Sequence, residues 1–336
     1  MKKLFSFLFT VLLISGGLQA QTQPAYDTTY IENLPETMVL RLYLSKKFTE
    51  FNFGPDLPVY EPNSGLNLGV GFTYQKFTLN LAAPPSFLNP TREKDWPGFL
   101  DLQVHYYPQK WIIDLFAQFY NGYVIPDFEE PDQKYLREDV RVRKFGVNAN
   151  YVFLGDRVSM AAAKDQSQIQ KKSAISPTAG LEAYRVKIQG DSLVVPGPIG
   201  VDTNYLRGDF FQIGPNVGVL GTLVFGKGFF LTGDFSYNVG LGYSQSDQIK
   251  ESREWEIVTG YFFRGFLGYN NRRFTANINY VYKHLNLAEH VGLNPSANTG
   301  NYRFNIGYKI QPGPKFKKTY NKFNPVRIME SIFKKN

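Results

Sequence analysis

The 336-residue chain contains no cysteine and only three histidines. Without cysteine it forms no disulfide bond and carries no lipid-anchored N-terminal cysteine. After the first twenty residues, no apolar run reaches the roughly 18 residues that a transmembrane helix needs. P-loops, dinucleotide fingerprints, zinc motifs and nucleophile elbows are also missing, so the sequence indicates no cofactor, no metal and no catalytic residues.

The first twenty residues have the pattern of a secretory signal peptide. Lys2 and Lys3 precede an apolar run over residues 4–14, and cleavage is expected after Ala20. The exported chain is then periplasmic, secreted or an outer-membrane barrel. The 22 tyrosines and 29 phenylalanines of the full sequence favour the barrel, because barrels carry aromatic girdles at both membrane interfaces.

The formal charge of +8 is concentrated at the C-terminus. Residues 311–336 hold seven Lys or Arg and one Glu, whereas residues 21–310 hold equal numbers of acids and bases. The basic pI is therefore a property of the tail, and no nucleic-acid partner is indicated.

Residues 99–123 read as one β-hairpin, with a turn at Pro108-Gln109 that brings Tyr106 opposite Trp111. Alternation with period two places the side chains of a strand on two faces. The face predicted to contact lipid carries Leu100, Leu102, Val104, Ile113, Leu115, Ala117 and Phe119. The opposite face carries Asp101, Gln103, His105, Ile112, Asp114, Phe116 and Gln118.

The same alternation recurs along the chain, behind the export signal, and predicts an all-β fold. We expect a single antiparallel up-and-down transmembrane barrel over residues 21–310, with about twelve strands, ten or fourteen being the alternatives. The expected strands are 38–48, 64–74, 77–83, 99–107, 111–123, 140–153, 173–188, 209–225, 229–243, 255–269, 274–284 and 302–310. An even strand count leaves 154–172 as a periplasmic or lumen-folded connection.

Four short turns are flanked by aromatic residues, and each carries Lys or Arg. Barrels have short periplasmic turns, aromatic girdles and long extracellular loops, so outer-membrane lipid is the expected partner. The predicted girdle comprises Tyr74, Phe77, Tyr106, Trp111, Phe225, Phe229, Tyr269 and Phe274. The predicted loops are 49–63, 84–98, 124–139, 189–208, 244–253 and 285–300. A soluble sandwich with ordinary hairpins is the alternative.

Several stretches resemble a Bacteroidota outer-membrane family known as domain of unknown function 4421. They are 27–31, 40–49, 67–71, 77–81, 100–107, 111–123 and 171–174. The resemblance implies an outer-membrane location in a Gram-negative bacterium. It implies no activity, substrate or site residue.

The residues predicted to face the lumen include ionisable groups of both signs. They are Arg41, Asp101, His105, Asp114, Lys144, Glu182, Asp234, Arg264, Lys283 and Arg303. Such groups form either ion pairs that fill the lumen or a selectivity ring. His105 near two carboxylates has the chemistry of a base or a metal ligand, but a hydrogen-bonded network is the simpler interpretation.

Two functional hypotheses follow. The favoured one is a structural or interaction barrel with a polar, largely filled lumen. The alternative is a narrow channel or transporter for small solutes, which inward glycines such as Gly69, Gly71 and Gly214 would accommodate. An enzyme is disfavoured because no nucleophile–base pair is recognisable. The acidic residues between Asp127 and Asp132 are expected to form a solvated loop rather than a calcium site.

The basic tail, 311–336, is expected to be periplasmic. Asn324 and Pro325 have the pattern of a helix start, followed by apolar residues on one face up to Phe333. A short amphipathic helix on a membrane surface is one expectation, and a disordered tail is the other. A periplasmic protein is a further possible partner for this tail.

Overall fold

The computed structural model describes residues 26–55, 57–74, 77–90, 98–108, 110–126, 134–194, 206–246, 255–289 and 292–323. Two compact units are present. One comprises residues 26–310, and the other comprises 1–25 together with 311–336. The predicted signal peptide and the predicted helix after Asn324 lie outside the described residues.

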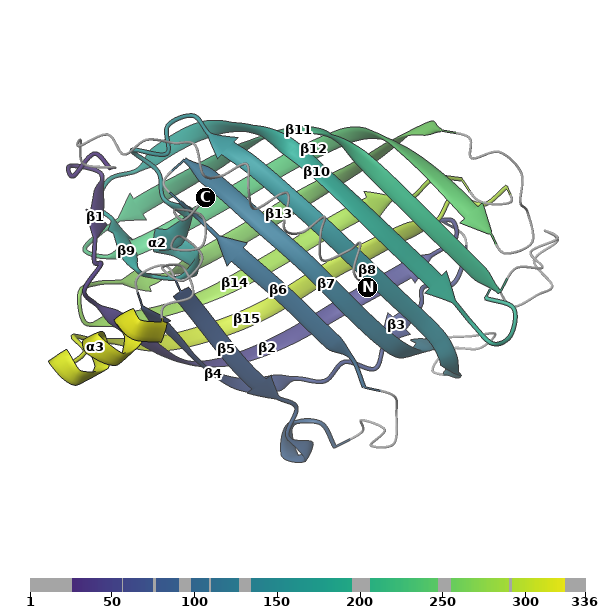
Figure 1. Ribbon diagram of the computed structural model, residues 1–336, viewed down its shortest axis with the longest axis horizontal. Coiled ribbons are helices and arrows are strands. Elements are labelled where there is room, and N and C mark those ends of the chain that lie inside the picture. The colour runs from purple at the N-terminus through teal and green to yellow at the C-terminus, as the bar shows by residue number, and fades with distance from the viewer. Residues whose placement is uncertain are drawn as a thin grey trace. The chain divides into compact units, whose positions relative to one another are not determined.

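The described part of residues 26–310 forms an antiparallel barrel sheet in which most strands adjacent in sequence pair with each other (Figure 1). Its twelve main strands in the described chain are β2 (Met38–Asn52), β4 (Asn67–Tyr74), β5 (Phe77–Ala83), β6 (Leu100–Tyr106), β7 (Trp111–Ile125), β8 (Tyr135–Val152), β10 (Ala174–Gln189), β11 (Arg207–Phe225), β12 (Phe229–Ser246), β13 (Glu256–Asn270), β14 (Phe274–Asn286) and β15 (Ser296–Ile310). The predicted strand number is therefore confirmed. β15 pairs with β2 along its full length, which joins the last strand of the sheet to its first long strand.

Most of the long strands separate their side chains into a buried inner face and a more exposed outer face. On β12, Asp234 is 1% exposed and the next residue, Phe235, is 43% exposed. Leu102 and Val104 are more than half exposed, and Ile113 and Leu115 share their outer face, as predicted. An exposed apolar belt around a sheet whose inner face is polar is the arrangement of a transmembrane barrel.

The strand connections divide the barrel into a turn end, with the short hairpins, and a loop end. At the turn between β11 and β12, Gly226 and Gly228 have φ values of 65° and 97°, which a residue without a side chain adopts readily. The β6–β7 turn is wider than predicted. Tyr106 pairs with Ile113, because the Trp111 amide bonds to the Pro108 carbonyl and closes a turn before the ladder begins.

Several strands extend further toward the loop end than the sequence predicted. β8 begins at Tyr135 and β15 begins at Ser296, inside the predicted loops 124–139 and 285–300. A backbone ladder needs no apolar alternation once the strand leaves the membrane, so the pattern disappears while the pairing continues. In this region Arg137 bonds to Asp139 through two nitrogen–oxygen contacts of 2.9 Å.

The connection between β8 and β10, residues 153–172, folds into the turn end of the barrel and is called the plug here. It contains α2 (Met160–Lys164), whose start is capped by the Ser159 hydroxyl, and β9 (Gln168–Gln170). β9 pairs with β1 (Ile31–Asn33), so the first described segment is fixed to the plug (Figure 1). Of the two predicted locations for this connection, the structure has the lumen-folded one.

The sheet closes differently at its two ends. At the loop end, Phe51 of β2 bridges to Tyr60, and the adjoining β3 (Glu61–Pro62) pairs with β7. Nearer the turn end, β5 and β6 are each seven residues long, against fifteen for β2 and β7. Within the described residues, no ladder joins β5 to β6. Their facing edges are called the seam.

The C-terminal unit contains α3 (Pro314–Phe323), earlier in the tail than the predicted helix. Phe316 and Tyr320, one helical turn apart, contact each other through their rings at 6.0 Å. Lysines occupy several of the remaining positions, so this short helix is basic and amphipathic. Among the helices that the structure describes, none has the length and apolar character needed to span a membrane.

Candidate functional site: the barrel lumen

The middle of the lumen is occupied by an ionic centre formed by Asp114, Asp234 and Arg264. The Arg264 guanidinium lies 2.6 Å from Asp114 Oδ2 and 2.8 Å from Asp234 Oδ2, so it links β7, β12 and β13. His105 Nδ1 lies 2.6 Å from the other oxygen of Asp114, and the Tyr107 hydroxyl donates to that oxygen at 3.2 Å. The acids and Arg264 are no more than 3% exposed. Buried charges of this kind need partners, and here they have them.

A second buried pair lies nearer the loop end. Lys283 Nζ is 2.5 and 2.7 Å from the two Glu182 oxygens, which connects β14 to β10 across the lumen. Lys283 also lies over the ring of Tyr184 at 5.1 Å. Lys144 donates to the Thr299 hydroxyl at 2.6 Å, which connects β8 to β15. These contacts span the interior between strands that are not neighbours.

The remaining predicted lumen residues lie on the seam side. Asp101 accepts hydrogen bonds from Gln118 and Tyr120 and lies 3.4 Å from Lys47 Nζ. Arg41 donates to the Asp165 carbonyl of the plug at 2.9 Å. The Arg303 guanidinium lies 4.4 Å from the centre of the Tyr43 ring. Arg41 also donates to the Thr73 hydroxyl, so these contacts of Arg41 and Arg303 are with a carbonyl, a hydroxyl and an aromatic ring rather than with carboxylates.

Sequence reasoning missed an apolar core at the loop end. Phe51 stacks on Tyr60 at 4.5 Å and meets Tyr123 edge-on at 5.0 Å. The buried members of this loop-end core are Phe51, Phe53, Tyr60, Tyr120, Tyr123, Ile125, Val140, Val142, Tyr184, Val186, Ile188, Val194, Phe210, Leu285, Leu287, Leu293 and Ala297. Tyr120 and Tyr123 are three positions apart, so regular alternation would place them on opposite faces of the strand. A β-bulge near Gly122 allows both to be buried, and the alternation of the sequence does not predict this bulge.

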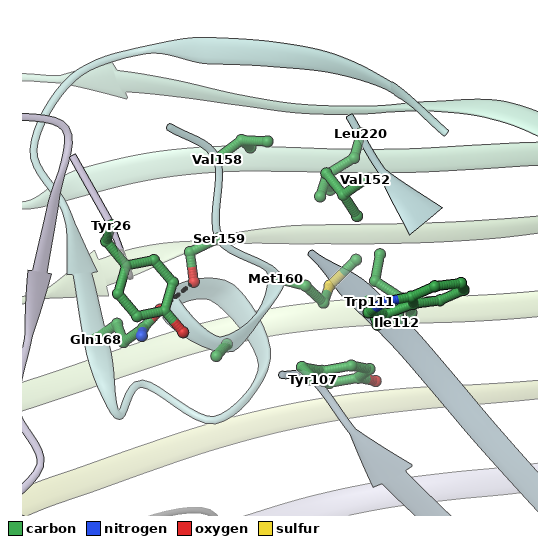
Figure 2. A pocket seen from close by; sticks show the side chains of 11 residues that line it. Tyr26, Tyr107, Trp111, Ile112, Val152, Val158, Ser159, Met160, Gln168 and Leu220 are labelled. Atoms are coloured by element: carbon green, nitrogen blue, oxygen red, sulfur yellow. Dashed lines mark hydrogen bonds between the residues drawn. The ribbon is translucent and has the colours of Figure 1, made fainter. Parts of the chain in front are cut away.

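The plug fills the turn end with a second apolar cluster. Its buried members are Ile112, Val152, Val158, Met160, Ala163, Leu220, Phe230 and Phe266. Figure 2 shows Met160 of α2 near the inward side chains of Ile112 and Val152, beside the Ser159–Gln168 hydrogen bond. The two cavities next to the plug each measure about 10 Å³, roughly the space of one water molecule.

Polar contacts fix the plug to the barrel wall. The Asn270 amide donates to the carbonyls of Ala162 and Gln168 at 3.1 and 2.9 Å. Lys309 donates to the Asn270 side-chain oxygen at 2.5 Å. In the plug itself, burial lowers the pKa of Lys164 to about 8, because the charged ammonium loses its hydration.

The inward glycines do not leave an open path along the wall. A Cβ placed on Gly69 would lie 2.3 Å from the Tyr43 ring, so that ring occupies the space over this glycine. A Cβ on Gly214 would meet the backbone of Gly240 at the same separation, so the two strands approach closely there. Rings and neighbouring backbone therefore use the volume that the missing side chains release.

The predicted girdle residues lie at the turn end. Trp111, Phe225, Phe229 and Phe274 are between 37% and 50% exposed, and Tyr106 and Tyr269 are half-buried. Tyr74 differs from the prediction because it is only 2% exposed. The side chain of Phe77 and the acidic residues 127–132 lie outside the described part of the chain. A second group of outer rings, which includes Tyr280 and Tyr302 stacked at 4.6 Å, lies further toward the loop end.

The fold and its two faces define the protein as a β-barrel of the transmembrane class. A model of the family described as domain of unknown function (DUF4421) matches residues 25–310, and the chain belongs to this family. No curated protein matches the sequence.

Solved structures that the chain resembles include outer membrane proteins. The outer membrane protease OmpT from Escherichia coli is 10% identical, with a TM-score of 0.35, over 83% of this chain and 98% of that one. The translocator domain of the autotransporter NalP from Neisseria meningitidis is 7% identical, with a TM-score of 0.33, over 93% and 96%. Ail of Yersinia pestis is 10% identical, with a TM-score of 0.22, over 83% and 99%. With TM-scores below 0.5, these likenesses carry no argument about function.

Proposed function

We propose that this chain is an integral barrel of the outer membrane of a Gram-negative bacterium, exported through a cleaved signal peptide, and that it acts as a structural or interaction protein rather than as a channel. Its outer belt supports the membrane location, since Leu42, Val70 and Val217 are each more than half exposed. The signal-like first twenty residues support export.

The observation that supports a filled lumen is that three groups of inward side chains follow one another along the barrel. The loop-end core closes one end, with Phe51, Tyr60 and Tyr123 in mutual contact. Arg264 and Lys283 with their carboxylates fill the middle. The plug closes the turn end. Solute passage would require these groups to separate, and each is held by packing or by charge pairs with little exposure.

In this role the barrel serves as a membrane anchor for the segments that it presents outside the bilayer. Those segments are the long loops and the basic tail. Lysines in α3 would attract an anionic lipid surface or an acidic periplasmic protein. The aromatic rings at the turn end fix the height of the barrel in the bilayer.

Solute flux tests the proposal. Purified protein reconstituted into liposomes is expected to give no swelling with small sugars and no steady conductance in planar bilayers, while a general porin prepared in parallel gives both. A large, steady conductance of the wild-type protein that Asp114→Ala leaves unchanged would refute the filled lumen and favour the channel.

A further inference from the structure

The seam side of the lumen differs from the opposite wall in accessibility. The inward ions of the opposite wall, Arg264, Lys283 and Glu182, are no more than 4% exposed. By contrast, the side chain of Lys47 is 20% exposed and that of His105 is 19% exposed. Arg303 and Lys164 are also only half-buried. Among these inward ions, those on the seam side are therefore the more accessible to solvent.

The accessible region carries an excess of positive charge. Its cations are Lys47, Lys164, Arg303 and the buried Arg41, whereas the carboxylates that act on them are Asp101, Asp114 and Asp165. Arg303 repels Arg41, Lys47 and Lys164, so the four basic side chains share one electrostatic environment. This group of four is called the seam recess. The ionic centre has the opposite balance, with two acids around one arginine.

One cation of the seam recess is held with its donors available. Tyr43 supports the Arg303 guanidinium from one side at 4.4 Å, and Arg303 Nε has no acceptor among the described residues. Buried guanidinium N–H groups are costly without acceptors, and their fork matches the two oxygens of a carboxylate or phosphate. Closer to the seam, the Asn80 Oδ1 atom of β5 lies over Gly71 of β4 and is also without a partner among the described residues.

The outer side of the seam is apolar. Leu79 and Leu81 on β5 and Leu102 and Val104 on β6 are between 41% and 61% exposed. The strand edges between them present N–H and C=O groups that hydrocarbon cannot satisfy. A ligand with an anionic oxygen head and an acyl chain matches this combination. Its head would accept hydrogen bonds inside the seam, and its chain would remain beside the outer leucines.

We propose that the seam is a lateral binding site for an anionic lipid, with the headgroup in the seam recess and Arg303 as the principal contact. The inference rests on the proposed membrane location of the barrel, but not on whether the lumen conducts. Because charge-assisted hydrogen bonds would hold the lipid headgroup, removal of the Arg303 guanidinium should cause a large loss of affinity for the lipid.

The test measures binding to the full-length protein in neutral detergent, with oleate as the probe. Saturable binding of oleate is expected. Arg303→Gln should weaken it at least about tenfold, Arg303→Lys should weaken it less, and Arg272→Gln should leave it unchanged, because Arg272 is an exposed turn arginine. Heat-modifiable migration in gels verifies that each variant is folded.

Three comparisons decide the chemistry. Oleyl alcohol binding as tightly as oleate would overturn recognition of the head. Inorganic phosphate competing at equal concentration would overturn the lipid and assign a free-anion site. If the protein has the mass of a dimer and does not bind oleate, the proposal is overturned. The seam would then be a site where the strands of two copies pair. If the proposed membrane location is itself wrong, the protein will not insert into liposomes, and this result is distinct from a loss of oleate binding.

Discussion

Arg264 Nη1 lies 2.6 Å from Asp114 Oδ2, although the two residues are 150 positions apart in sequence. The contact connects β13 to β7 across the interior, between strands that are not paired. Since both side chains are almost fully buried, this bond is part of what holds opposite walls of the barrel together. Loss of one partner of such a buried pair strongly reduces the free energy of unfolding, whereas a surface ion pair makes only a small net contribution to it.

Removal of this arginine should strongly destabilise the barrel. Arg264→Met leaves the carboxylates of Asp114 and Asp234 buried without their shared cation, so we expect a loss of about 3–5 kcal/mol in unfolding free energy. Urea unfolding of the refolded protein in detergent measures it. A triple variant that adds Asp114→Asn and Asp234→Asn should recover much of the loss, and Arg272→Met should change stability by less than about 1 kcal/mol. An Arg264→Met protein as stable as wild type would contradict a structural role for the centre.

The outer face of β6 should not tolerate a charge. Val104→Arg is expected to cost about 2–4 kcal/mol if the position is near the bilayer midplane, because arginine must leave water for hydrocarbon. Phe274→Arg at the turn end should cost only about 0–1 kcal/mol beyond its lost packing, since it lies at the expected interface. Reversible unfolding in lipid vesicles provides both values, and equal costs at the two positions would exclude the assigned membrane span.

Asn270 should govern the stability of the plug more than that of the whole barrel. Asn270→Ala removes two hydrogen bonds to plug carbonyls and leaves Lys309 without its acceptor, so about 1–3 kcal/mol of local stability should be lost. Hydrogen exchange should accelerate over residues 159–170 while strands β11 to β14 keep their protection. Asn279→Ala, on the next strand, is the matched control. Uniform acceleration across the barrel would mean that the plug does not open as a separate unit.

Stability should depend on pH through Lys164. Its pKa is lowered to about 8 in the fold, against about 10.4 in the unfolded chain. Between these values the unfolded chain binds more protons, so stability should rise with pH, and below pH 8 the charged ammonium carries its full burial penalty. The charged groups that act on it are Arg41, Asp114, Asp165 and Arg303, and His105 also interacts with it.

Lys164→Met should therefore abolish the slope between pH 8 and about 10.4 and raise stability at pH 7 by about 1–3 kcal/mol. Thermal unfolding followed by circular dichroism at several pH values measures the effect. Lys227→Met, at an exposed turn, should keep the wild-type slope. A slope that persists in Lys164→Met would assign the titration to another group.

The tail is predicted to be periplasmic, on the same side as the short turns. An even number of strands places both ends of the barrel on one side of the membrane, and each Lys or Arg near an anionic surface contributes about 1 kcal/mol. A single cysteine at Ser331 should react with a membrane-impermeant thiol reagent only after the outer membrane is permeabilised. Reaction in intact cells would reverse the assigned topology.

The sequence by itself determined the strands and their faces. Alternation has a period of two whatever the tertiary structure, so Asp114 and Asp234 were assignable to the inner face, and Leu102 and Val104 to the outer one. Aromatic residues beside glycine and lysine marked the turns for the same local reason. Strand parity also excluded residues 154–172 from the sheet.

Only the tertiary structure decided which inward residues meet. Partners such as Lys283 and Glu182 are 101 positions apart, and no local pattern encodes the curvature that brings β14 to face β10. The bulge at Gly122, the folding of the plug into the lumen and the unpaired edges of β5 and β6 depend on how the whole sheet closes. Closure is a property of all twelve strands together, and therefore the sequence of any one of them does not predict it.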